Sequence, residues 1–356
     1  MRLAIVGVGL IGGSIGLAAR ERCGATVVGF SRSSDSLARA HECGAIDRVA
    51  TSIEECVAGA DAAFVAVPVG ALADVAARVL AGTGEDCVVS DVGSTKRAIV
   101  DALEDPRFVG GHPLAGAETS GVEHARSDLF EGATWYLTPT ERTSGVLYER
   151  LYRLIHSLGA KPTAIDPETH DRILASVSHL PHVLANVLVA QAAGALDAGE
   201  VRLPATGPSF RDATRVAGAS SAIWTDIYMS NRDALAAQIE ETIGRLADVR
   251  DALLEGDPDR LTAWNDTAAS HRRRLLEAQL AGGELFELRA SVPNRPGVIA
   301  QLALELGRAG VNITDMALYP AADMSDGVVA LWIAGDEAAR RAQELVAELG
   351  FPVART

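Results

Sequence analysis

The sequence predicts three domains in order along the chain. The first, residues 1–165, is an α/β domain with a mostly parallel, doubly wound sheet. An all-helical domain over 166–280 follows, and a ferredoxin-like βαββαβ domain over 284–356 ends the chain. Three observations predict this. Short β-rich runs alternate with amphipathic stretches at first, then only helical spacing of apolar residues appears, and finally the pattern is mixed again.

Composition limits the classes of protein that this chain can belong to. It has 356 residues, 48% of them hydrophobic, which is a composition that folds, and its length is enough for two or three domains of about 150 residues each. Lys and Arg number 32 against 47 Asp and Glu, giving a net charge of −15. This balance argues against a general nucleic-acid or anionic-membrane binder, but it allows a local basic pocket for an anionic small substrate.

Targeting and redox signals indicate a cytoplasmic protein. We find no apolar run of about 18 residues, so no transmembrane span is expected. The apolar N-terminus has patterned glycines and no cleavage motif, and we interpret it as a buried strand and turn rather than a signal peptide. The cysteines lack CxxC spacing, which favours reduced thiols over a zinc site: Cys23, Cys43, Cys56 and Cys87.

The first domain follows from the alternation of its elements. Strands are expected at residues 3–6, 26–30, 63–67, 88–92, 108–110, 135–138 and 162–165. Helices are expected between them at 11–21, 34–42, 71–80 and 96–103. This order predicts a parallel sheet with helices on both faces.

The later elements follow the same reasoning. In the helical domain, breaks are expected at Gly199, 204–208 and 256–258, and residues 281–284 (AGGE) are a plausible linker. The third domain has strands at 285–292, 311–318 and 328–333, helices at 297–309 and 337–349, and a short last strand that includes Val353. This order is that of a ferredoxin-like fold.

A glycine motif after the first strand predicts a Rossmann-type dinucleotide site. Gly7 permits a tight turn, Gly9 lets the backbone approach a pyrophosphate, and Gly12 allows the helix to pack closely on the sheet. Leu10 and Ile11 open the helix, whose free N–H groups favour phosphate. The alternative is a tight strand–helix turn that binds no ligand.

The end of the second strand selects the cofactor. NAD-preferring sites usually place Asp or Glu there, whereas this chain has Ser31 and Arg32 and no carboxylate before Asp35. Ser31 and Arg32 can hold a 2′-phosphate, so we favour NADP over NAD. The alternative is that Arg32 stacks on adenine or lies in solvent with either cofactor. Val67 and Pro68, at the end of the third strand, are assigned to the same site.

Five further segments carry a family resemblance. They are DVGSTK at 91–96, GGHPLAGAE at 110–118, HD at 170–171, SHLPH at 178–182 and FRDATR at 210–215. Together with GLIGGS at the glycine turn, and in this order, they resemble the prephenate/arogenate dehydrogenase family of tyrosine biosynthesis. The resemblance implies an oxidative decarboxylation of prephenate to 4-hydroxyphenylpyruvate, in which a hydride goes to NAD(P)⁺ and the ring carboxylate leaves as CO₂. Prephenate is our default substrate. Arogenate, with an amino group in place of the keto group, is the alternative.

The resemblance implies roles for three residues of the first domain. His112 is the base that accepts the hydroxyl proton, with a capping histidine in a structural loop as the alternative. Ser94 bonds the same hydroxyl or orients His112, and it can also be the N-cap of the following helix. Glu118 orders the substrate entrance, with a simple surface carboxylate as the alternative.

The helical domain supplies the other substrate residues. His182 is assigned to substrate contact and His170 to a supporting role. Ser178 lies four residues before His182, hence on the same face of a helix, although Pro181 predicts a kink or boundary there. A metal site built on His179 and His182 is the rival interpretation, disfavoured because no HExxH motif or carboxylate set accompanies it. His179 is expected to be buried and to bond backbone.

Arginines are expected to bind the substrate carboxylate. Arg215 is assigned this role because a guanidinium matches a carboxylate in bidentate fashion, with Arg211 one turn earlier on the same face. The alternative for Arg211 is an ion pair with Asp212 or another surface carboxylate. Lys96 is either a further cation of the site or a surface lysine. No metal is expected.

The third domain resembles an ACT module, a ligand-sensing domain that some members of this family append. Its signature is VPNRPG at 292–297 followed by GVNI at 310–313. The resemblance implies that Asn294, Gly297 and Asn312 contact an amino-acid effector, with tyrosine the natural ligand. The alternative is a dimerisation domain without ligand. The apolar helical domain favours a homodimer.

Two other classes compete with this interpretation. Hydroxyacid, 6-phosphogluconate-type and pyrroline-carboxylate enzymes share the domain plan but lack the paired GGHPLAGAE and SHLPH segments. A nucleotide- and effector-sensing regulatory protein explains the two ends of the chain but not its central histidines and arginines. Turnover separates an enzyme from such a regulatory protein, because a sensor binds nucleotide without reducing it.

Overall fold

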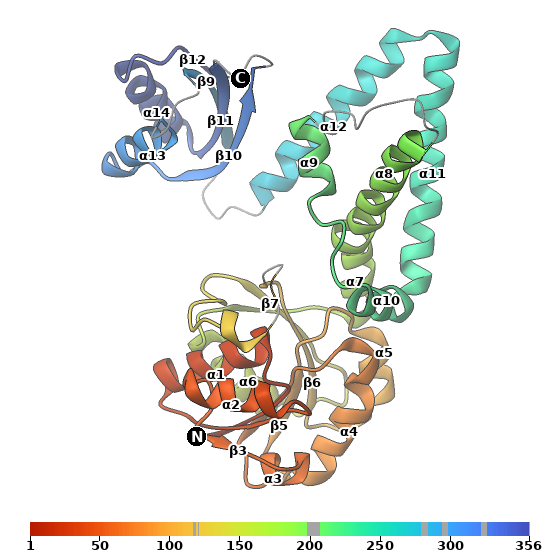
Figure 1. Ribbon diagram of the computed structural model, residues 1–356, viewed down its shortest axis with the longest axis vertical. Helices are drawn as coiled ribbons and strands as arrows, with labels where there is room; N and C mark the ends of the chain where they lie inside the picture. Colours follow the sequence, from red (N-terminus) through yellow and green to blue (C-terminus); the bar gives the residue numbers. More distant parts are fainter. Residues whose placement is uncertain are drawn as a thin grey trace. The chain divides into compact units, whose positions relative to one another are not determined.

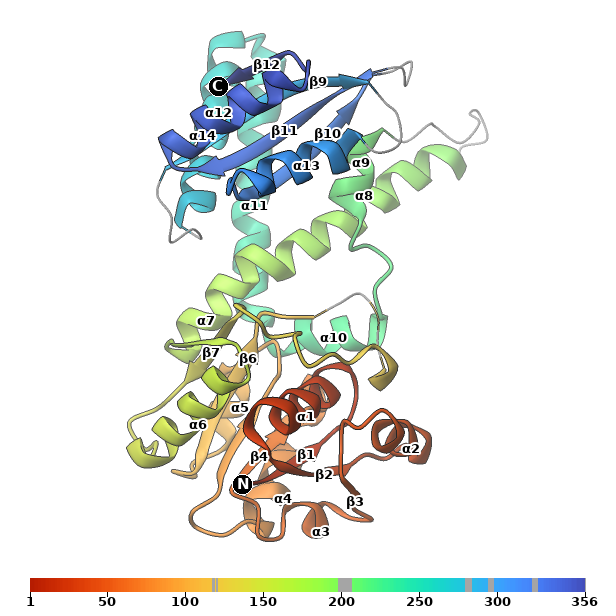
Figure 2. The ribbon, with the colours of Figure 1, turned by 90° about the vertical axis from the view of Figure 1, so that its left-hand side faces the viewer.

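A computed structural model describes residues 1–116, 119, 121–197, 207–278, 284–293, 298–321 and 326–355 (Figures 1 and 2). The chain forms two compact units, Met1–Ile243 and Gly244–Thr356.

The first unit is built on one sheet with strand order β3-β2-β1-β4-β5-β6-β7-β8. All neighbouring strands are parallel except β6 and β7, which are antiparallel. The predicted mostly parallel, doubly wound sheet is therefore confirmed. The strands are β1 Arg2–Val6, β2 Thr26–Phe30, β3 Arg48–Val49, β4 Ala62–Val65, β5 Val88–Asp91, β6 Phe108–Pro113, β7 Thr134–Thr138 and β8 Lys161–Ala164.

Alternating side chains on each strand fill two cores, one on each face of the sheet. Leu3 and Ile5 of β1 pack with helices α1 (Leu10–Cys23), α2 (Ser34–Glu42) and α6 (Gly145–Ser157). Their neighbours in β1, Ala4 and Val6, pack with α3 (Ile53–Val57), α4 (Leu72–Gly82) and α5 (Arg97–Ala102) on the opposite face. Figure 2 shows α1 and α2 together, apart from α3 and α4. Burial on both faces fixes the register that brings the strand ends into line.

Three elements of this unit were not predicted. Strand β3 has only two residues, and α3 has only five, which is too short for a periodic pattern. Helix α6 is longer, with Leu147, Leu151, Leu154 and Ile155 on its buried face, a spacing that does carry a helical signal. The predicted helix at 71–80 begins one residue later, after a short 3₁₀ turn, η1 (Val69–Ala71).

The helical part of the first unit begins with a long, interrupted helix. Helix α7 (Pro167–Leu174) leads through a π-helical turn, η3 (Ala175–His179), into α8 (Leu180–Asp197). The side chain of Asp166 accepts a hydrogen bond from Thr169 N and caps α7. Then come α9 (Pro208–Thr214), α10 (Ser221–Ser230) and α11 (Arg232–Glu255), which crosses into the second unit. The breaks expected at Gly199 and over most of 204–208 lie outside the described residues.

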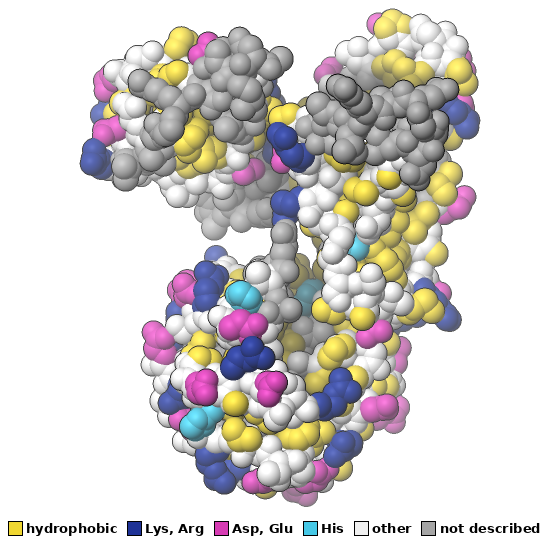
Figure 3. All heavy atoms as spheres, in the orientation of Figure 1, with side chains coloured by type: hydrophobic (Ala, Val, Ile, Leu, Met, Phe, Trp, Pro, Cys, Tyr) yellow, Lys and Arg dark blue, Asp and Glu magenta, His cyan; other side chains and the backbone are white. Residues whose placement is uncertain are grey.

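Helix α8 and its neighbours expose an apolar surface. Val187, Leu188 and Val189 of α8 are exposed, as are Ile223 and Met229 of α10. Figure 3 shows hydrophobic side chains gathered along the helical part of the first unit. Contrary to expectation, one helical stretch, Pro167–Gly194, reaches by length and composition the hydropathy of a membrane span. This is weak evidence for a membrane, because helices of globular domains can pass the same test.

The second unit contains the end of α11, α12 (Pro258–Ala278) and a four-stranded antiparallel sheet of order β10-β11-β9-β12. A left-handed Gly256 ends α11, as the break predicted at 256–258 requires. The elements follow one another in the predicted order βαββαβ. They are β9 Leu285–Pro293, α13 Val298–Arg308, β10 Ile313–Pro320, β11 Asp326–Ala334, α14 Asp336–Glu348 and β12 Val353–Arg355. Most of the linker expected at 281–284 lies outside the described residues.

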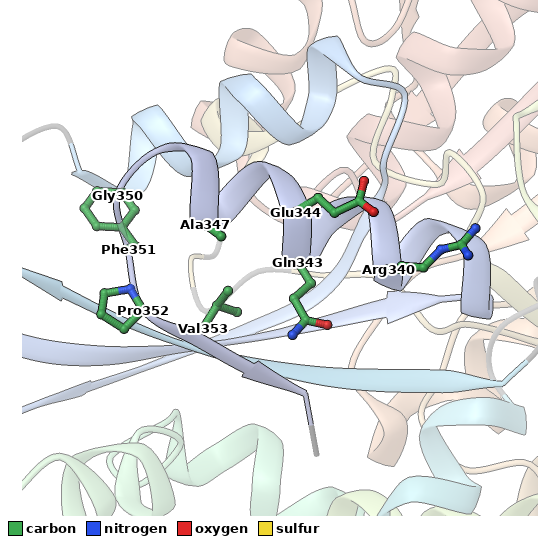
Figure 4. A pocket seen from close by; sticks show the side chains of 8 residues that line it. All are labelled: Arg340, Gln343, Glu344, Ala347, Gly350, Phe351, Pro352 and Val353. Carbon is green, nitrogen blue, oxygen red and sulfur yellow. The ribbon is translucent and has the colours of Figure 1, made fainter.

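One face of this small sheet is covered by its helices. Leu288, Leu302, Leu331 and Val346 belong to the core between the sheet and helices α13 and α14. A shallow hollow of 510 Å³ lies along α14 and the turn into β12, with Arg340, Gln343 and Glu344 beside the apolar Ala347 and Val353 (Figure 4).

Candidate active site

The predicted nucleotide turn lies at the crevice of the sheet, between β1 and β4. Gly7 N donates to Phe30 O at 2.8 Å, and Ala66 N donates to Val6 O at 2.7 Å, so the ends of three strands are held together. Gly7 has φ +104°, a conformation that favours glycine, and a Cβ there would lie 2.2 Å from Ala66 O. A Cβ on Gly12 would lie 2.0 Å from Gly7 O. Both glycines are therefore required by packing alone.

Gly9 differs from these two glycines. A Cβ built on it meets nothing within 4 Å. Gly9 is the N-cap of α1 and supplies no side-chain cap, and the first turn of α1 has no acidic residue. The first N–H groups of this helix thus face an open space that suits an anion.

A cavity of 340 Å³ continues from this turn. Ser31, Arg32, Val67 and Pro68 line it, as do Gly7 and Gly9, whereas Leu10 and Ile11 begin the helix beside it. A residue missed by sequence reasoning also lines it: Arg78 of α4, which forms an ion pair with Glu54 at 2.9 Å. The glycine cradle, the uncapped helix N-terminus and the two arginines fit the pyrophosphate and phosphate groups of a dinucleotide.

A second cavity, of 400 Å³, lies where the sheet meets the helical part of the same unit. His112 comes from the end of β6 and Ser94 from the loop after β5, so two predicted residues are brought together. Ser94 is not the N-cap of α5, because Lys96 occupies that position. The lining is Ser94, His112, Pro113, Leu114, Ala115, Tyr136, Ile173, Leu174, Val177, Ser178, His179, Trp224 and Ile227.

A buried ion pair supports the loop that carries His112. Lys96 and Asp91 are fully buried and bonded to each other, and Lys96 Nζ also donates to Gly111 O at 2.8 Å. Asp91 accepts from Gly111 N at 3.0 Å and from Gly93 N at 2.7 Å. Burial lowers the pKa of Lys96, while Asp91 acts in the opposite direction. Both roles considered for Lys96, surface lysine and substrate cation, were therefore wrong; it fixes the backbone next to His112.

His112 is buried against a second histidine. Its Nδ1 lies 2.9 Å from Nε2 of His170, and Nδ1 of His170 lies 2.8 Å from Oδ1 of Asp171. Desolvation, followed by the proximity of His170, Lys96 and His179, lowers the pKa of His112 well below the ordinary value of 6.5. His112 is thus neutral near pH 7 and can accept a proton.

The π-helical turn decides which residues of SHLPH reach the cavity. Ser178 and His179 line it, but His182 does not. His182 stacks on Trp224 with ring centroids 3.6 Å apart, and its Nδ1 bonds the hydroxyl of Tyr228. The wider turn changes the phase of the helix, so residues four apart no longer share one face. No sequence signal announces such a turn, although Pro181 marks the place.

His179 does not bond backbone as expected. It is buried, and its Nδ1 lies 3.2 Å from the side-chain amide nitrogen of Asn231. Its Nε2 is buried without a hydrogen-bond partner among the described residues. Burial lowers the pKa of His179 to about 4.

The remaining predicted residues lie away from the cavity lining or outside the described residues. Arg211 is on α9 and Arg215 is its C-cap; both are exposed, and neither lines the cavity. Asn312 is exposed before β10. Glu118, Asn294 and Gly297 lie outside the described residues. Within the described parts of the chain, no group of His, Cys, Asp and Glu could hold a metal ion.

Comparisons with known proteins match both halves of this site. The sequence model described as "Prephenate dehydrogenase, nucleotide-binding domain" matches residues 15–164, and "Prephenate dehydrogenase, dimerization domain" matches 166–266. The prephenate dehydrogenase of Bacillus subtilis is 31% identical over 352 residues, which are 97% of this chain and 95% of the relative.

Solved structures agree with these matches. A prephenate dehydrogenase from A. aeolicus, in complex with hydroxyphenyl propionate and NAD⁺, has 30% identity and a TM-score of 0.71, covering 77% of this chain and 98% of that one. The arogenate dehydrogenase of Synechocystis has 26% identity and a TM-score of 0.67, covering 77% of this chain and 100% of that one. The match to the Bacillus relative extends over nearly the whole length of both proteins. Identity at this level shows that the chain belongs to the prephenate dehydrogenase family.

Proposed function

We propose that this protein catalyses the oxidative decarboxylation of prephenate to 4-hydroxyphenylpyruvate in tyrosine biosynthesis. As a member of its family it is an oxidoreductase with a nicotinamide cofactor. The observation that carries the proposal is a neutral, buried His112 that lines a 400 Å³ cavity beside Ser94, in the same unit as a dinucleotide cradle.

His112 is the general base in this proposal. Its Nδ1 is engaged by His170, which leaves Nε2 for the hydroxyl of the substrate. A nicotinamide held in the neighbouring cradle would supply the acceptor for the hydride of the carbon that carries this hydroxyl. Nε2 of His112 receives the hydroxyl proton, loss of the ring carboxylate as CO₂ leaves an aromatic phenolate, and return of the proton gives the phenol. Ser94 donates to or accepts from the same hydroxyl and orients it.

The remaining contacts are proposed from the family motifs. Ser178 and the supporting His170 complete the polar part of the site. His182 contributes indirectly, by stacking on Trp224, which lines the cavity. Arg215, with Arg211, binds the substrate carboxylate at the entrance, because the described cavity lining itself contains no Lys or Arg. Glu118 orders that entrance. Apolar groups such as Leu174 and Ile227 keep water from the ring.

For the cofactor we propose NADP in preference to NAD. Ser31, Arg32 and Arg78 line one cavity, and together they offer a hydroxyl and two guanidinium groups to a 2′-phosphate. Among the residues that the structure describes, no carboxylate lines that cavity to bond a ribose 2′-hydroxyl. The A. aeolicus relative binds NAD⁺, which makes NAD the alternative.

We also propose how the three regions divide the work. Residues 1–165 bind the dinucleotide, 166–280 complete the substrate site and form a homodimer, and 284–356 act as an ACT module. The apolar face of α8 supports the dimer, since a second copy would cover it. The protein would act in the cytoplasm.

The ACT proposal places tyrosine at Asn294, Gly297 and Asn312. Its support is the βαββαβ order of the second unit and the VPNRPG and GVNI segments. The test is tyrosine titration of the wild-type rate against Asn312→Ala. Tyrosine inhibition that Asn312→Ala weakens supports the module, and no response in either protein leaves it a dimerisation domain without ligand.

Arogenate dehydrogenase activity is the second candidate, because the Synechocystis relative is named for it. It uses the same base and differs only where the side chain of the substrate is held. Rates with each substrate at equal concentration decide between the two. A higher kcat/KM for prephenate supports the proposal, and a higher kcat/KM for arogenate replaces it.

A further inference from the structure

His170 lies directly behind His112, and its contacts indicate how His112 is held. Only the kinetic effect of this arrangement rests on the proposed function. His112, His170 and Asp171 form an unbroken line of hydrogen bonds from the cavity into the protein. Nδ1 of His112 lies 2.9 Å from Nε2 of His170, and Nδ1 of His170 lies 2.8 Å from Oδ1 of Asp171. His170 is fully buried and Asp171 nearly so, which removes competing water.

The carboxylate at the end of this line accepts several hydrogen bonds. Oδ1 of Asp171 accepts from Lys96 N at 2.7 Å, and Oδ2 accepts from Arg97 N at 2.9 Å. The carbonyl of the same residue accepts from the side chain of Asn231 at 2.7 Å. Three elements therefore hold Asp171: α5, α7 and the junction of α10 with α11. Its carboxylate is an acceptor for every neighbour, so the proton between it and His170 belongs to His170.

This polarity fixes the next hydrogen bond. Because Nδ1 of His170 carries the proton, its Nε2 is an acceptor in the neutral ring. Nδ1 of His112 must then be the donor, and Nε2 of His112 is left without a proton. We propose that His170 and Asp171 are positioning residues that hold His112 in the tautomer whose basic nitrogen faces the substrate.

The same line lowers the cost of charge on His112 during the reaction. When Nε2 receives the hydroxyl proton, the new imidazolium keeps its Nδ1 proton and is stabilised by Asp171 through His170. Desolvation, followed by the proximity of His170, Lys96 and His179, acts in the opposite direction and lowers the pKa of His112. Asp91 partners Lys96, so Asp171 is the anion in line with the base.

Two substitutions at His170 distinguish a need for its hydrogen-bond acceptor from a need for a side chain that only fills the space. In His170→Gln, the amide oxygen can accept from Nδ1 of His112 while the amide nitrogen donates to Asp171. We expect it to keep kcat within about tenfold of wild type. His170→Met fills the site without an acceptor and should lose about 10²–10³-fold in kcat, with a small change in KM. Equal losses in both variants would overturn the proposal.

Asp171→Asn removes the anion at the end of the line. Its amide nitrogen would also face a backbone N–H group, because each carboxylate oxygen accepts from one, Oδ1 from Lys96 N and Oδ2 from Arg97 N. The expected loss in kcat is about 10²–10³-fold. In whatever activity remains, the acid limb of the kcat/KM profile should move to lower pH, since the anion that stabilises the imidazolium is gone. A residue with a structural role only would lower the amount of folded enzyme and leave that limb in place.

A measurement that needs no turnover closes the test. ¹⁵N NMR of the full-length enzyme with labelled histidine, assigned by the loss of signals in His112→Gln and His170→Gln, reports which ring nitrogen is protonated. We expect the proton on Nδ1 in both rings of the wild-type enzyme. A wild-type His112 protonated on Nε2 would refute the proposal. Absence of turnover with either substrate would instead refute the proposed function and leave this result standing.

Discussion

His112 combines two properties that a general base needs in this reaction. It is 8% exposed at the wall of a cavity, and its pKa is held well below 6.5, first by desolvation and then by His170. A neutral imidazole is thus present throughout the physiological range. The cost is a weaker base, which the carboxylate of Asp171 at the end of the hydrogen-bonded line partly offsets.

Replacing this base should stop the chemistry and spare binding. We expect His112→Asn to lower kcat by about 10²–10⁴-fold with KM changed little, because general-base catalysis contributes roughly that much. Steady-state kinetics measures it, with His156→Asn, at an exposed position on α6, as the control. A loss seen mainly in KM would assign His112 to substrate binding instead.

The base should also work in acid better than an ordinary histidine. Since its pKa lies below 6.5, kcat/KM should stay level as pH falls through that value and decline only at lower pH. A pH profile over the range in which the enzyme stays folded measures this. A decline centred on 6.5 or above would show that His112 is not desolvated as described.

His179 makes stability depend on pH. Its folded pKa of about 4 is below the usual 6.5, so the unfolded chain binds the proton more readily between these values. Stability is fully present above pH 6.5 and is lost as pH falls towards 4. The wild type should lose about 3 kcal/mol more than His179→Gln across this window. Urea unfolding followed by tryptophan fluorescence tests it, and equal losses in both proteins would contradict the burial of this ring.

Sequence reasoning placed at the two cavities the residues that belong to local motifs. Gly7, Gly9, Ser31 and Arg32 line the nucleotide cavity, and His112 with Ser94 lines the other, as their positions after strands predicted. It failed for Lys96, because burial of a lysine depends on Asp91 and Gly111 meeting it from two other segments.

At the scale of elements, the strand–turn–helix unit separates packing from ligand binding. Gly12 is needed by close packing and Gly9 is not, although both belong to one motif. This difference gives the two glycines separate tests.

Gly9→Ala should weaken dinucleotide binding at least tenfold without loss of stability, since its methyl group enters the open space meant for phosphate. Gly12→Ala should lower both the affinity for the dinucleotide and the stability, because its methyl group would lie 2.0 Å from a carbonyl oxygen. Nucleotide titration and thermal unfolding measure the two effects. Gly84→Ala is the matched control, for its Cβ also meets nothing within 4 Å. Equal destabilisation by Gly9→Ala would contradict this division.

The elements that sequence patterns missed are short or irregular. A two-residue β3 and a five-residue α3 carry too few residues for periodicity to act. The π-helical turn Ala175–His179 has no characteristic residue type that would reveal it in a sequence. Because of this turn, His179 lines the cavity and His182 does not. Helical spacing was the correct principle there, applied with the wrong number of residues per turn.

The exposed apolar face of α8 is a candidate surface for contact with a second copy of the whole molecule. Val187 is 52% exposed and Leu188 is 39% exposed. In the proposed homodimer, Leu188→Lys should shift the protein towards monomer, as measured by sedimentation velocity. Val146→Lys, at an exposed apolar position on α6, is the control and should leave the assembly unchanged. A wild-type monomer would contradict the proposed dimer.

Turnover with the two substrates and the two cofactors tests the proposed reaction. The full-length protein is given prephenate or arogenate with NAD⁺ or NADP⁺, and formation of the reduced nicotinamide is followed by absorbance. We predict reduction with prephenate, faster with NADP⁺ than with NAD⁺. No reduction in any of the four combinations, by a protein that still binds the dinucleotide, would contradict the proposed function.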